Sequence, residues 1–328
     1  MRALITGISG FVGSHLAEYL LANTDWQVAG TVFGPVSNIA HLSDRLILYP
    51  AELSLPETMR SILEEARPDF VFHLAAQPNP SLSLKDPWST LENNIRLQLN
   101  LLEAVARLRL PARVLVVGSA EEYGQIRPED LPISETAPMR PATPYAVSKI
   151  AQDYLGLQYH LSHKVQAIRA RPFNHIGARQ SLGFVAADFA FQIAQIEAGK
   201  QAPEVRVGNL DAERDFSDVR DIVRGYYLAL TQGQPGEAYN LGSEVAHPVR
   251  FLLDTLIGLA DHKVSVVQEA RRVRSDSVPR LVADCGKLRA CTGWHTTIPL
   301  EQSLADVLTY WREQARASKD ATPSALRH

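Results

Sequence analysis

The sequence has little cysteine, since Cys285 and Cys291 are the only two among its 328 residues. Their spacing matches no zinc-binding pattern, and one late pair does not make a disulfide framework. We therefore expect two reduced thiols that pack as small apolar groups, and no metal site.

The sequence also lacks an excess of one charge and any long hydrophobic run. Its formal net charge is −3, so nothing indicates attraction to nucleic acid or to an anionic membrane surface. No apolar run approaches the roughly 18 residues that span a bilayer, and no basic and apolar signal sequence precedes the first strand. These absences predict a cytoplasmic protein whose partners are neither nucleic acid nor membrane.

Short apolar runs alternate with longer helical patterns through the first half of the chain. The runs are aliphatic or β-branched and do not alternate with polar residues, which is typical of strands buried on both faces. They lie at 3–6, 27–33, 45–49, 70–74, 114–118 and 165–170, with helical stretches at 11–22, 57–66, 90–108 and 145–161. Because parallel neighbours need crossover connections, this alternation predicts a doubly wound parallel Rossmann sheet of the α/β class.

The pattern loosens after about Pro172. Helical stretches remain at 184–198, 220–231, 249–260 and 300–316, separated by short extended pieces at 204–207 and 263–267. A chain of 328 residues exceeds the usual size of a single core. We therefore expect a dinucleotide-binding domain (1–171 and 215–245), a smaller C-terminal α+β substrate lobe (172–214 and 246–316) and a frayed tail (317–328).

A glycine-rich turn joins the first strand to the first helix. Gly7, Gly10 and Gly13 are spaced Gly-x-x-Gly-x-x-Gly. Glycines remove the Cβ atoms that block a pyrophosphate, and the helix N-terminus offers free N–H groups and a favourable dipole. The spacing differs from the commoner Gly-x-Gly-x-x-Gly, but its strand–turn–helix context favours a phosphate cradle over a plain turn.

The end of the second strand bears on the kind of dinucleotide. An acid at that point would bind the adenosine ribose hydroxyls of NAD. No Asp or Glu occurs from Trp26 to Ser43, and the nearest arginine is Arg45. A missing carboxylate removes repulsion against a 2′-phosphate, so the sequence favours NADP(H) and leaves NAD(H) open.

Tyr145 and Lys149 are spaced one helical turn apart, behind a Thr143 cap and Pro144 at the first helical position. A nearby ammonium favours a phenolate, so we expect Lys149 to lower the pKa of Tyr145 and to make a general acid/base beside a carbonyl. Ser119 follows the fifth strand, at the edge where open α/β sheets bind ligands, and is placed to hydrogen-bond the reacting oxygen. A solvated helix face for the pair and a turn cap for Ser119 are the alternatives.

Together these features resemble the extended short-chain dehydrogenase/reductases. The resemblance rests on the glycine loop, on the segment His73-Leu74-Ala75-Ala76-Gln77, on Ser119 and on Tyr145 with Lys149, and it extends through about Arg316. Segments of the second half, at 171–177, 184–190, 207–210 and 214–221, resemble the reductases within that group that act on GDP-4-keto-6-deoxy-D-mannose and make GDP-D-rhamnose.

The resemblance implies a role for each matched residue. Hydride would pass from the nicotinamide to the sugar C4 carbonyl, Tyr145 would protonate the alkoxide, Lys149 would hold the nicotinamide ribose and Ser119 would orient the ketone. The residues matched to cofactor contacts are Gly7, Gly10, Phe11, Val12, Gly13, Leu74, Ala75, Ala76, Asn94, Tyr145 and Lys149. Those matched to substrate contacts are Asn174, Val185, Asn209, and the diphosphate-binding Arg214 and Arg274. The stretches 90–108 and 145–161 resemble helices that pair in homodimers.

The sequence departs from the family pattern at two places. The acidic motif after the third strand is present only as Glu52-Leu53, and Ser275 and Ser277 stand where a Pro and an acid are usual beside Arg274. The first departure weakens the assignments on the adenine side, and the second gives Arg274 unusual neighbours.

Other activities remain open. Dehydratases of this superfamily carry Thr-Asp-Glu where this chain has Ser119-Ala120-Glu121. The acid at position 120 is missing, but GDP-mannose dehydratases lack it too and keep the Glu, so Glu121 stays a catalytic candidate. Ser119 in place of Thr, with the patterns at 173–177 and 188–190, favours the reductase. A nucleotide-sugar 4-epimerase is a third activity, and a dinucleotide-sensing protein that binds cofactor without turnover is the non-enzyme alternative.

Overall fold

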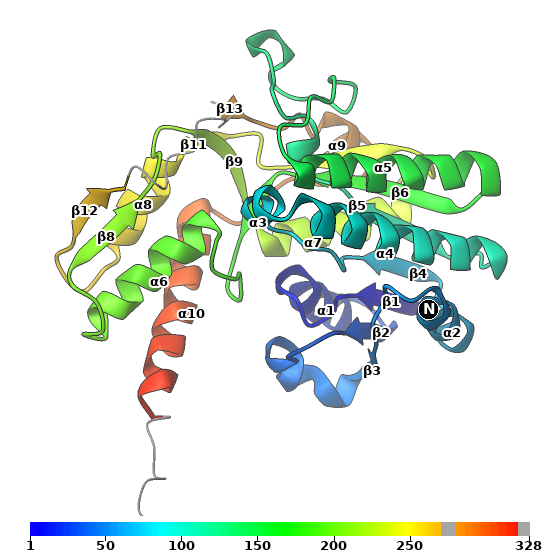
Figure 1. Cartoon of the computed structure of the whole chain (residues 1–328), viewed down its shortest axis with the longest axis horizontal. Coiled ribbons are helices and arrows are strands. Elements are labelled where there is room, and N and C mark those ends of the chain that lie inside the picture. The colour runs from blue at the N-terminus through cyan, green and yellow to red at the C-terminus, as the bar shows by residue number, and fades with distance from the viewer. Residues whose placement is uncertain (270–279, 321–328) are drawn as a thin grey trace, which may run out of the picture.

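The main body is built on a seven-stranded parallel sheet. The computed structural model describes residues 1–269 and 280–320 (Figure 1). The strand order is β10-β6-β5-β4-β1-β2-β3, and every neighbouring pair is parallel. The strands are β1 Arg2–Thr6, β2 Gln27–Val32, β3 Leu46–Pro50, β4 Phe70–His73, β5 Arg113–Val117, β6 Gln166–Pro172 and β10 Ala238–Leu241. The predicted doubly wound α/β sheet is confirmed, with β10 as a strand that the sequence pattern did not reveal.

Two helical layers cover this sheet. One apolar cluster joins β1 and β2 to α1 (Phe11–Asn23) and α7 (Val219–Gln232) on one face. A second cluster lies on the other face, under α2 Pro56–Ala66, α4 Pro87–Arg107 and α5 Pro144–His163. Because both faces are covered, the strands carry apolar side chains without alternation.

The smaller part lies at the carboxyl ends of the main strands and is drawn at the left of Figure 1. Its sheet has the order β11-β9-β13, with β7 also pairing with β9, and a separate ribbon joins β8 to β12. A third apolar cluster packs its three helices together. Its elements are β7 Asn174–Ile176, α6 Val185–Glu197, β8 Glu204–Val207, β9 Glu213–Asp218, β11 Ala246–Pro248, α8 Val249–Gly258, β12 Ser265–Gln268, β13 Arg280–Leu281 and α10 Leu300–Asp320.

Short elements complete the described chain. They are η1 Ser37–Arg45, α3 Pro80–Lys85, η2 Ala120–Glu122, η3 Pro128–Asp130 and α9 Gly286–Thr292. None of the helices in the described ranges is long and apolar enough to cross a membrane.

The structure differs from the predicted division at three places, the first being β9, whose residues 215–218 were expected in the main domain but belong to the smaller sheet. Helix α10 runs to Asp320, so the first residues of the expected tail are helical, and 321–328 lie outside the described residues. The segment from Ala283 to Trp294, expected in the smaller lobe, packs into the cluster of the main sheet. The Trp294 indole N–H donates to the Asp221 carbonyl at 3.0 Å, a contact between distant segments that no local pattern announces. We keep the two-part division as a proposal in which 283–294 belongs to the main body.

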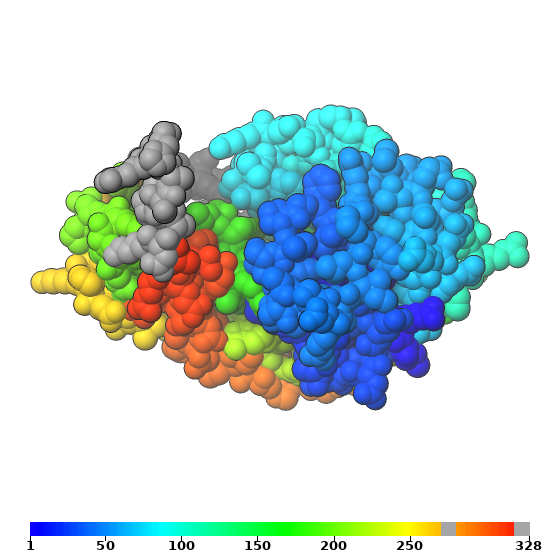
Figure 2. Space-filling view, turned by 90° about the horizontal axis from the view of Figure 1, so that it is seen from below, coloured from blue at the N-terminus to red at the C-terminus, as the bar shows by residue number. Residues whose placement is uncertain are grey.

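The two parts face each other across the carboxyl edge of the main sheet. Figure 2 shows the amino-terminal part in blue and cyan on one side, and α6 and α10 in green and red on the other. Because the carboxyl ends of parallel strands meet at the same edge, residues that follow β1, β4, β5 and β6 are brought together there.

Candidate active site

A cavity of about 1060 Å³ lies between the carboxyl edge of the main sheet and the smaller part. It brings together nearly all the residues that the sequence singled out. Those in its lining are Gly7, Gly10, Phe11, Val12, Gly13, Leu74, Ala75, Ala76, Ser119, Glu121, Tyr145, Lys149, Asn174, Val185, Asn209 and Arg214. Asn94 is not part of the lining, and Arg274 lies outside the described residues.

The glycine loop forms a cradle at one end of this cavity. Gly7 has a φ of +71°, and a Cβ on it would lie 3.2 Å from the Ala75 Cα. A Cβ on Gly13 would overlap the Gly7 carbonyl oxygen and lie 2.8 Å from the Ile8 Cα. Gly10 caps α1 without a side-chain hydrogen bond, which leaves first-turn N–H groups to a ligand. These residues fit a dinucleotide pyrophosphate, because the close approach it needs is built into the backbone.

The loop after β4 is held from behind by Asn94. Its Oδ1 accepts from the Gln77 N–H at 2.7 Å, and its Nδ2 donates to the Gln77 carbonyl at 3.1 Å and to the Ser148 hydroxyl at 2.9 Å. Asn94 is fully buried, so its side chain supports the loop from behind and does not border the cofactor site as predicted. It fixes the loop whose Leu74 and Ala75 line the cavity, while its neighbour Asn93 reaches the lining.

Helix α5 begins as predicted and carries the Tyr–Lys pair. The Thr143 hydroxyl accepts from the Ala146 N–H at 3.1 Å, and Pro144 occupies the first helical position. Lys149 Nζ lies 5.9 Å from the centre of the Tyr145 ring and donates to the Val117 carbonyl at 3.0 Å. Both side chains are buried at the bottom of the cavity, and the lysine is fixed to the end of β5.

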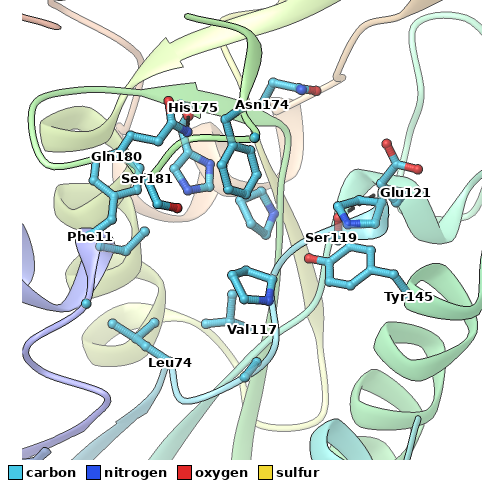
Figure 3. A pocket seen from close by; sticks show the side chains of 18 of the residues that line it. Phe11, Leu74, Val117, Ser119, Glu121, Tyr145, Asn174, His175, Gln180 and Ser181 are labelled. Atoms are coloured by element: carbon cyan, nitrogen blue, oxygen red, sulfur yellow. Dashed lines mark hydrogen bonds between the residues drawn. The ribbon is translucent and has the colours of Figure 1, made fainter. Parts of the chain in front are cut away.

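Ser119 faces the Tyr145 phenol from the turn after β5, whereas the Glu121 carboxylate points away from that phenol (Figure 3). Burial raises the pKa of Tyr145, hydrogen bonding to Ser119 opposes the rise, and Glu121 and Glu122 add to it. The pKa of Tyr145 therefore shifts upward and not downward as expected, because burial outweighs the hydrogen bond to Ser119. A raised pKa keeps the phenol protonated, which is the state that donates a proton.

Two buried titratable groups at this edge were not among the predicted site residues. His73 lines the cavity, its Nδ1 lies 2.8 Å from the Thr6 hydroxyl, and burial together with Lys149 lowers its pKa to about 3. Glu122 is fully buried, and its Oε1 accepts from the Ser119 N–H at 2.7 Å. No sequence pattern separates Glu122 from Glu121, since both simply follow a strand.

The far end of the cavity lies in the smaller part. Asn174 begins β7, Val185 begins α6, and Arg214 lies on β9, where its Nη1 donates to the Glu213 carbonyl at 2.8 Å. Arg206 also lines the cavity, 3.2 Å from Glu269, although no motif pointed to it. Guanidinium groups at this end suit a diphosphate, for which their forked donors are well matched.

The adenine side is formed by residues after β2 and β3. Phe33, Pro35, Ser37 and Asn38 line it, and Glu52 is the acid that reaches it. The guanidinium of Arg45 instead donates to the Leu21 carbonyl at 2.8 Å.

Arg179 supplies the cation that the adenine side does not receive from Arg45. It lines the cavity and donates to the Asn38 carbonyl at 3.3 Å and to Glu18 at 2.6 Å. It comes from a loop after β7, so no pattern near β2 could have revealed it.

The chain is similar, in sequence and in structure, to one group of known proteins. The sequence model of the GDP-mannose 4,6 dehydratase family matches residues 4–307. A GDP-6-deoxy-D-mannose reductase of Pseudomonas aeruginosa is 35% identical over 316 residues, covering 96% of this chain and 98% of the relative. GDP-mannose 4,6 dehydratase 1 of Arabidopsis thaliana is 29% identical, covering 97% and 91%. The solved structure of RMD from Pseudomonas aeruginosa complexed with NADPH has a TM-score of 0.84 at 35% identity, covering 95% of this chain and 99% of that one.

Proposed function

The chain belongs to the GDP-mannose 4,6 dehydratase family, and from this premise we propose that it is an NAD(P)H-dependent reductase of nucleotide sugars. The reaction is reduction of the C4 ketone of a GDP-4-keto-6-deoxy sugar, giving GDP-D-rhamnose. The similarity to a GDP-6-deoxy-D-mannose reductase over nearly the full length of both chains supports this choice.

The observation that carries the proposal is a protonated phenol at the junction of the two halves of one cavity. Tyr145 faces Ser119 in the cavity whose lining also includes the glycine cradle and Arg214. Because burial keeps Tyr145 protonated, its first action is to donate a proton. Reduction requires that direction, whereas dehydration and epimerisation begin with removal of a proton from a sugar hydroxyl.

Each side chain then has one task. The bound nicotinamide supplies the hydride that reaches C4. The Ser119 hydroxyl orients the ketone oxygen, and the Tyr145 phenol gives its proton to the alkoxide as charge develops there. Lys149, fixed on the Val117 carbonyl, holds the nicotinamide ribose and keeps a positive charge beside the phenol.

NADP(H) is the favoured cofactor, with NAD(H) as the second choice. No carboxylate occurs between Phe33 and Asn38 to repel a 2′-phosphate. Arg179 adds a cation to the lining of the same region, and the RMD structure holds NADPH. Gly7 and Gly13 would receive the pyrophosphate of either dinucleotide.

Dehydration of GDP-mannose is the second candidate, and Glu121 is the observation that favours it. Its carboxylate lines the cavity and would have to take the C5 proton. In Figure 3 it points away from the phenol that marks the reacting carbon, which favours reduction.

The test is a pair of incubations with purified protein. The first contains GDP-4-keto-6-deoxy-mannose with NADPH or NADH, and loss of the reduced cofactor is followed. The second contains GDP-mannose, and formation of the 4-keto sugar is followed. Cofactor loss in the first alone supports the reductase. Activity in the second alone overturns it, and binding without turnover in either indicates a dinucleotide sensor.

A homodimer in the cytoplasm completes the proposal. Val147, Tyr154 and Leu161 recur every seventh residue along α5 and are 44%, 53% and 62% exposed. Leu99 on the neighbouring α4 is also exposed. Such an apolar stripe on two adjacent helices suits pairing with the same face of a second copy.

A further inference from the structure

A carboxyl group is buried directly behind Ser119. Glu122 is the last residue of η2 and has no exposed surface. Its Oε1 accepts from the Ser119 N–H at 2.7 Å, closing a capping box with the Ser119 hydroxyl. A Cβ on Gly118 would overlap that same oxygen, so the glycine makes room for the carboxyl. The turn that presents Ser119 is therefore built around Glu122.

The second oxygen of Glu122 is incompletely paired. Among the described residues Oε2 has no hydrogen-bond partner, and it lies 3.4 Å from the Arg171 Nε. Arg171 gives its Nε and Nη2 to Asp153 instead, at 2.9 and 3.1 Å, and Arg169 adds a third bond to Asp153 at 2.6 Å. Asp153 is thus the carboxylate that both arginines bind, and the Glu122 charge is only partly balanced by them.

The remaining cation near Glu122 is Lys149, which lies one turn before Asp153 on α5. Burial lowers the pKa of Lys149 to about 8, and Glu122 opposes that fall. Burial and Asp153 raise the pKa of Glu122 to about 8, while Arg171 and Lys149 oppose the rise. Both groups adjoin the end of β5, where Lys149 Nζ donates to the Val117 carbonyl at 3.0 Å and Glu122 accepts from the Ser119 N–H at 2.7 Å, so each charge stabilises the other.

Two phenols also face this pair. The Glu122 charge contributes to the raised pKa values of Tyr123 and Tyr145. Ionised Glu122 therefore favours the protonated phenol of Tyr145 as well as the ammonium of Lys149.

We propose that Glu122 is a positioning residue of the reduction, whose carboxylate holds the Ser119 turn and keeps Lys149 in its ammonium form. This inference rests on the proposed function, because only there does the ammonium serve the chemistry. Glu122 ionises as pH rises, and its charge then opposes the loss of the Lys149 proton. Without that charge, Lys149 loses its proton at a lower pH. The alkaline limb of the plot of kcat against pH then moves to lower pH.

Glu122→Gln tests the charge, because the amide keeps an oxygen that can accept from the Ser119 N–H. We expect kcat within about two-fold of the wild type near pH 6.5 and about ten-fold lower near pH 9, since one pKa unit is a factor of ten. Glu57→Gln is the matched control, because Glu57 is an exposed carboxylate on α2 whose ion-pair partner is Arg60. It should follow the wild-type profile.

A second readout needs no turnover. The acetylation rate of Lys149 in the cofactor-free protein, measured by peptide mass spectrometry across pH, reports the neutral amine. Its midpoint should move to lower pH in Glu122→Gln and stay in place in Glu57→Gln. If the wild type reduces no sugar, the proposed function fails, but this midpoint still tests the link between Glu122 and Lys149.

Glu122→Asp keeps the charge on a shorter side chain and guards against misfolding of the amide variant. We expect its kcat to fall equally at all pH values, because Ser119 is misplaced while the alkaline limb stays. The proposal is overturned if Glu122→Gln and the wild type share the same alkaline limb and the same acetylation midpoint. It is also overturned if the alkaline limb of Glu122→Asp moves to lower pH.

Discussion

Burial determines the protonation states of the residues around the Tyr145 phenol. The phenol is held protonated, and His73 is held neutral with a pKa of about 3. Lys149 lies 5.9 Å from the Tyr145 ring centre, helps to lower the His73 pKa, and is anchored on the Val117 carbonyl. The site thus offers one proton donor and one cation, which is what reduction of a ketone to an alcohol requires.

Tyr145→Phe removes the proton donor and keeps the ring. We expect kcat to fall by about 10²- to 10⁴-fold, the usual contribution of a general acid, while NADPH affinity measured by fluorescence titration stays within about three-fold, because Lys149 and the glycine cradle remain. Tyr154→Phe, on the exposed side of the same helix, should keep full activity. A Tyr145→Phe enzyme with near-normal kcat would mean that another group supplies the proton.

His73 makes stability depend on pH. Its folded pKa is depressed from 6.5 to about 3, so this stability is present above pH 6.5 and is lost as pH falls toward the folded value. Unfolding free energy from urea titrations should therefore fall below pH 6.5 by about 1.4 kcal/mol per pH unit from this residue. His73→Asn, which can still bond the Thr6 hydroxyl, should lose that part of the slope. An unchanged slope in the variant would show that His73 is protonated in the folded protein.

At the scale of elements, the loop after β4 depends on a helix far from it in sequence. Asn94 of α4 binds both backbone groups of Gln77 and the Ser148 hydroxyl of α5. One side chain therefore joins α4, α5 and the loop that lines the cofactor end of the cavity.

Asn94→Ala leaves these buried polar groups without partners. We expect a loss of about 2 to 4 kcal/mol in unfolding free energy, at about 1 to 3 kcal/mol for each unsatisfied group, together with weaker NADPH binding. Asn23→Ala removes an exposed hydrogen bond at the end of α1 and serves as the control for both measurements. Unchanged NADPH affinity in Asn94→Ala would mean that the loop needs no such support.

The sequence predicted those helices and strands whose own residues carry a clear apolar pattern or a helix cap. Strands of the main sheet are continuous apolar runs, and the helix at Pro144 carries its own cap in Thr143. Strand β9 was not predicted, because Glu213–Asp218 reads as a polar loop. Its buried Asp215 is satisfied by the N–H groups of Ser243 and Ala283, which only the folded chain brings near. Ser119, Tyr145 and Lys149 were predicted because they belong to local patterns of this kind. Glu122 and His73 were not predicted as site residues, because only the folded chain buries them beside the site.

At the scale of the whole molecule, the cavity exists because the two parts are held together. Arg179, from the loop after β7, donates to His15 at 2.8 Å and to Glu18 at 2.6 and 2.7 Å, both on α1. The helix that opens the cofactor cradle is thereby tied to the segment that begins the substrate end.

The proposed dimer is tested on the exposed stripe of α5. Tyr154→Glu places a charge at the centre of the stripe and should convert the dimer to a monomer in light scattering after size exclusion. Val245→Glu changes an apolar residue of similar exposure, at 51%, away from the stripe and should leave the dimer intact. If Tyr154→Glu keeps the mass of the wild type, the stripe is not the interface.

The central claim is that this protein delivers hydride to a sugar C4 ketone. NADPH that carries deuterium at both C4 positions of the nicotinamide, incubated with GDP-4-keto-6-deoxy-mannose, tests it directly by mass spectrometry and NMR of the product. We expect a GDP-6-deoxy sugar with one deuterium at C4 for each NADPH consumed. A product without deuterium at C4, or dehydration of GDP-mannose with no consumption of NADPH, would contradict it.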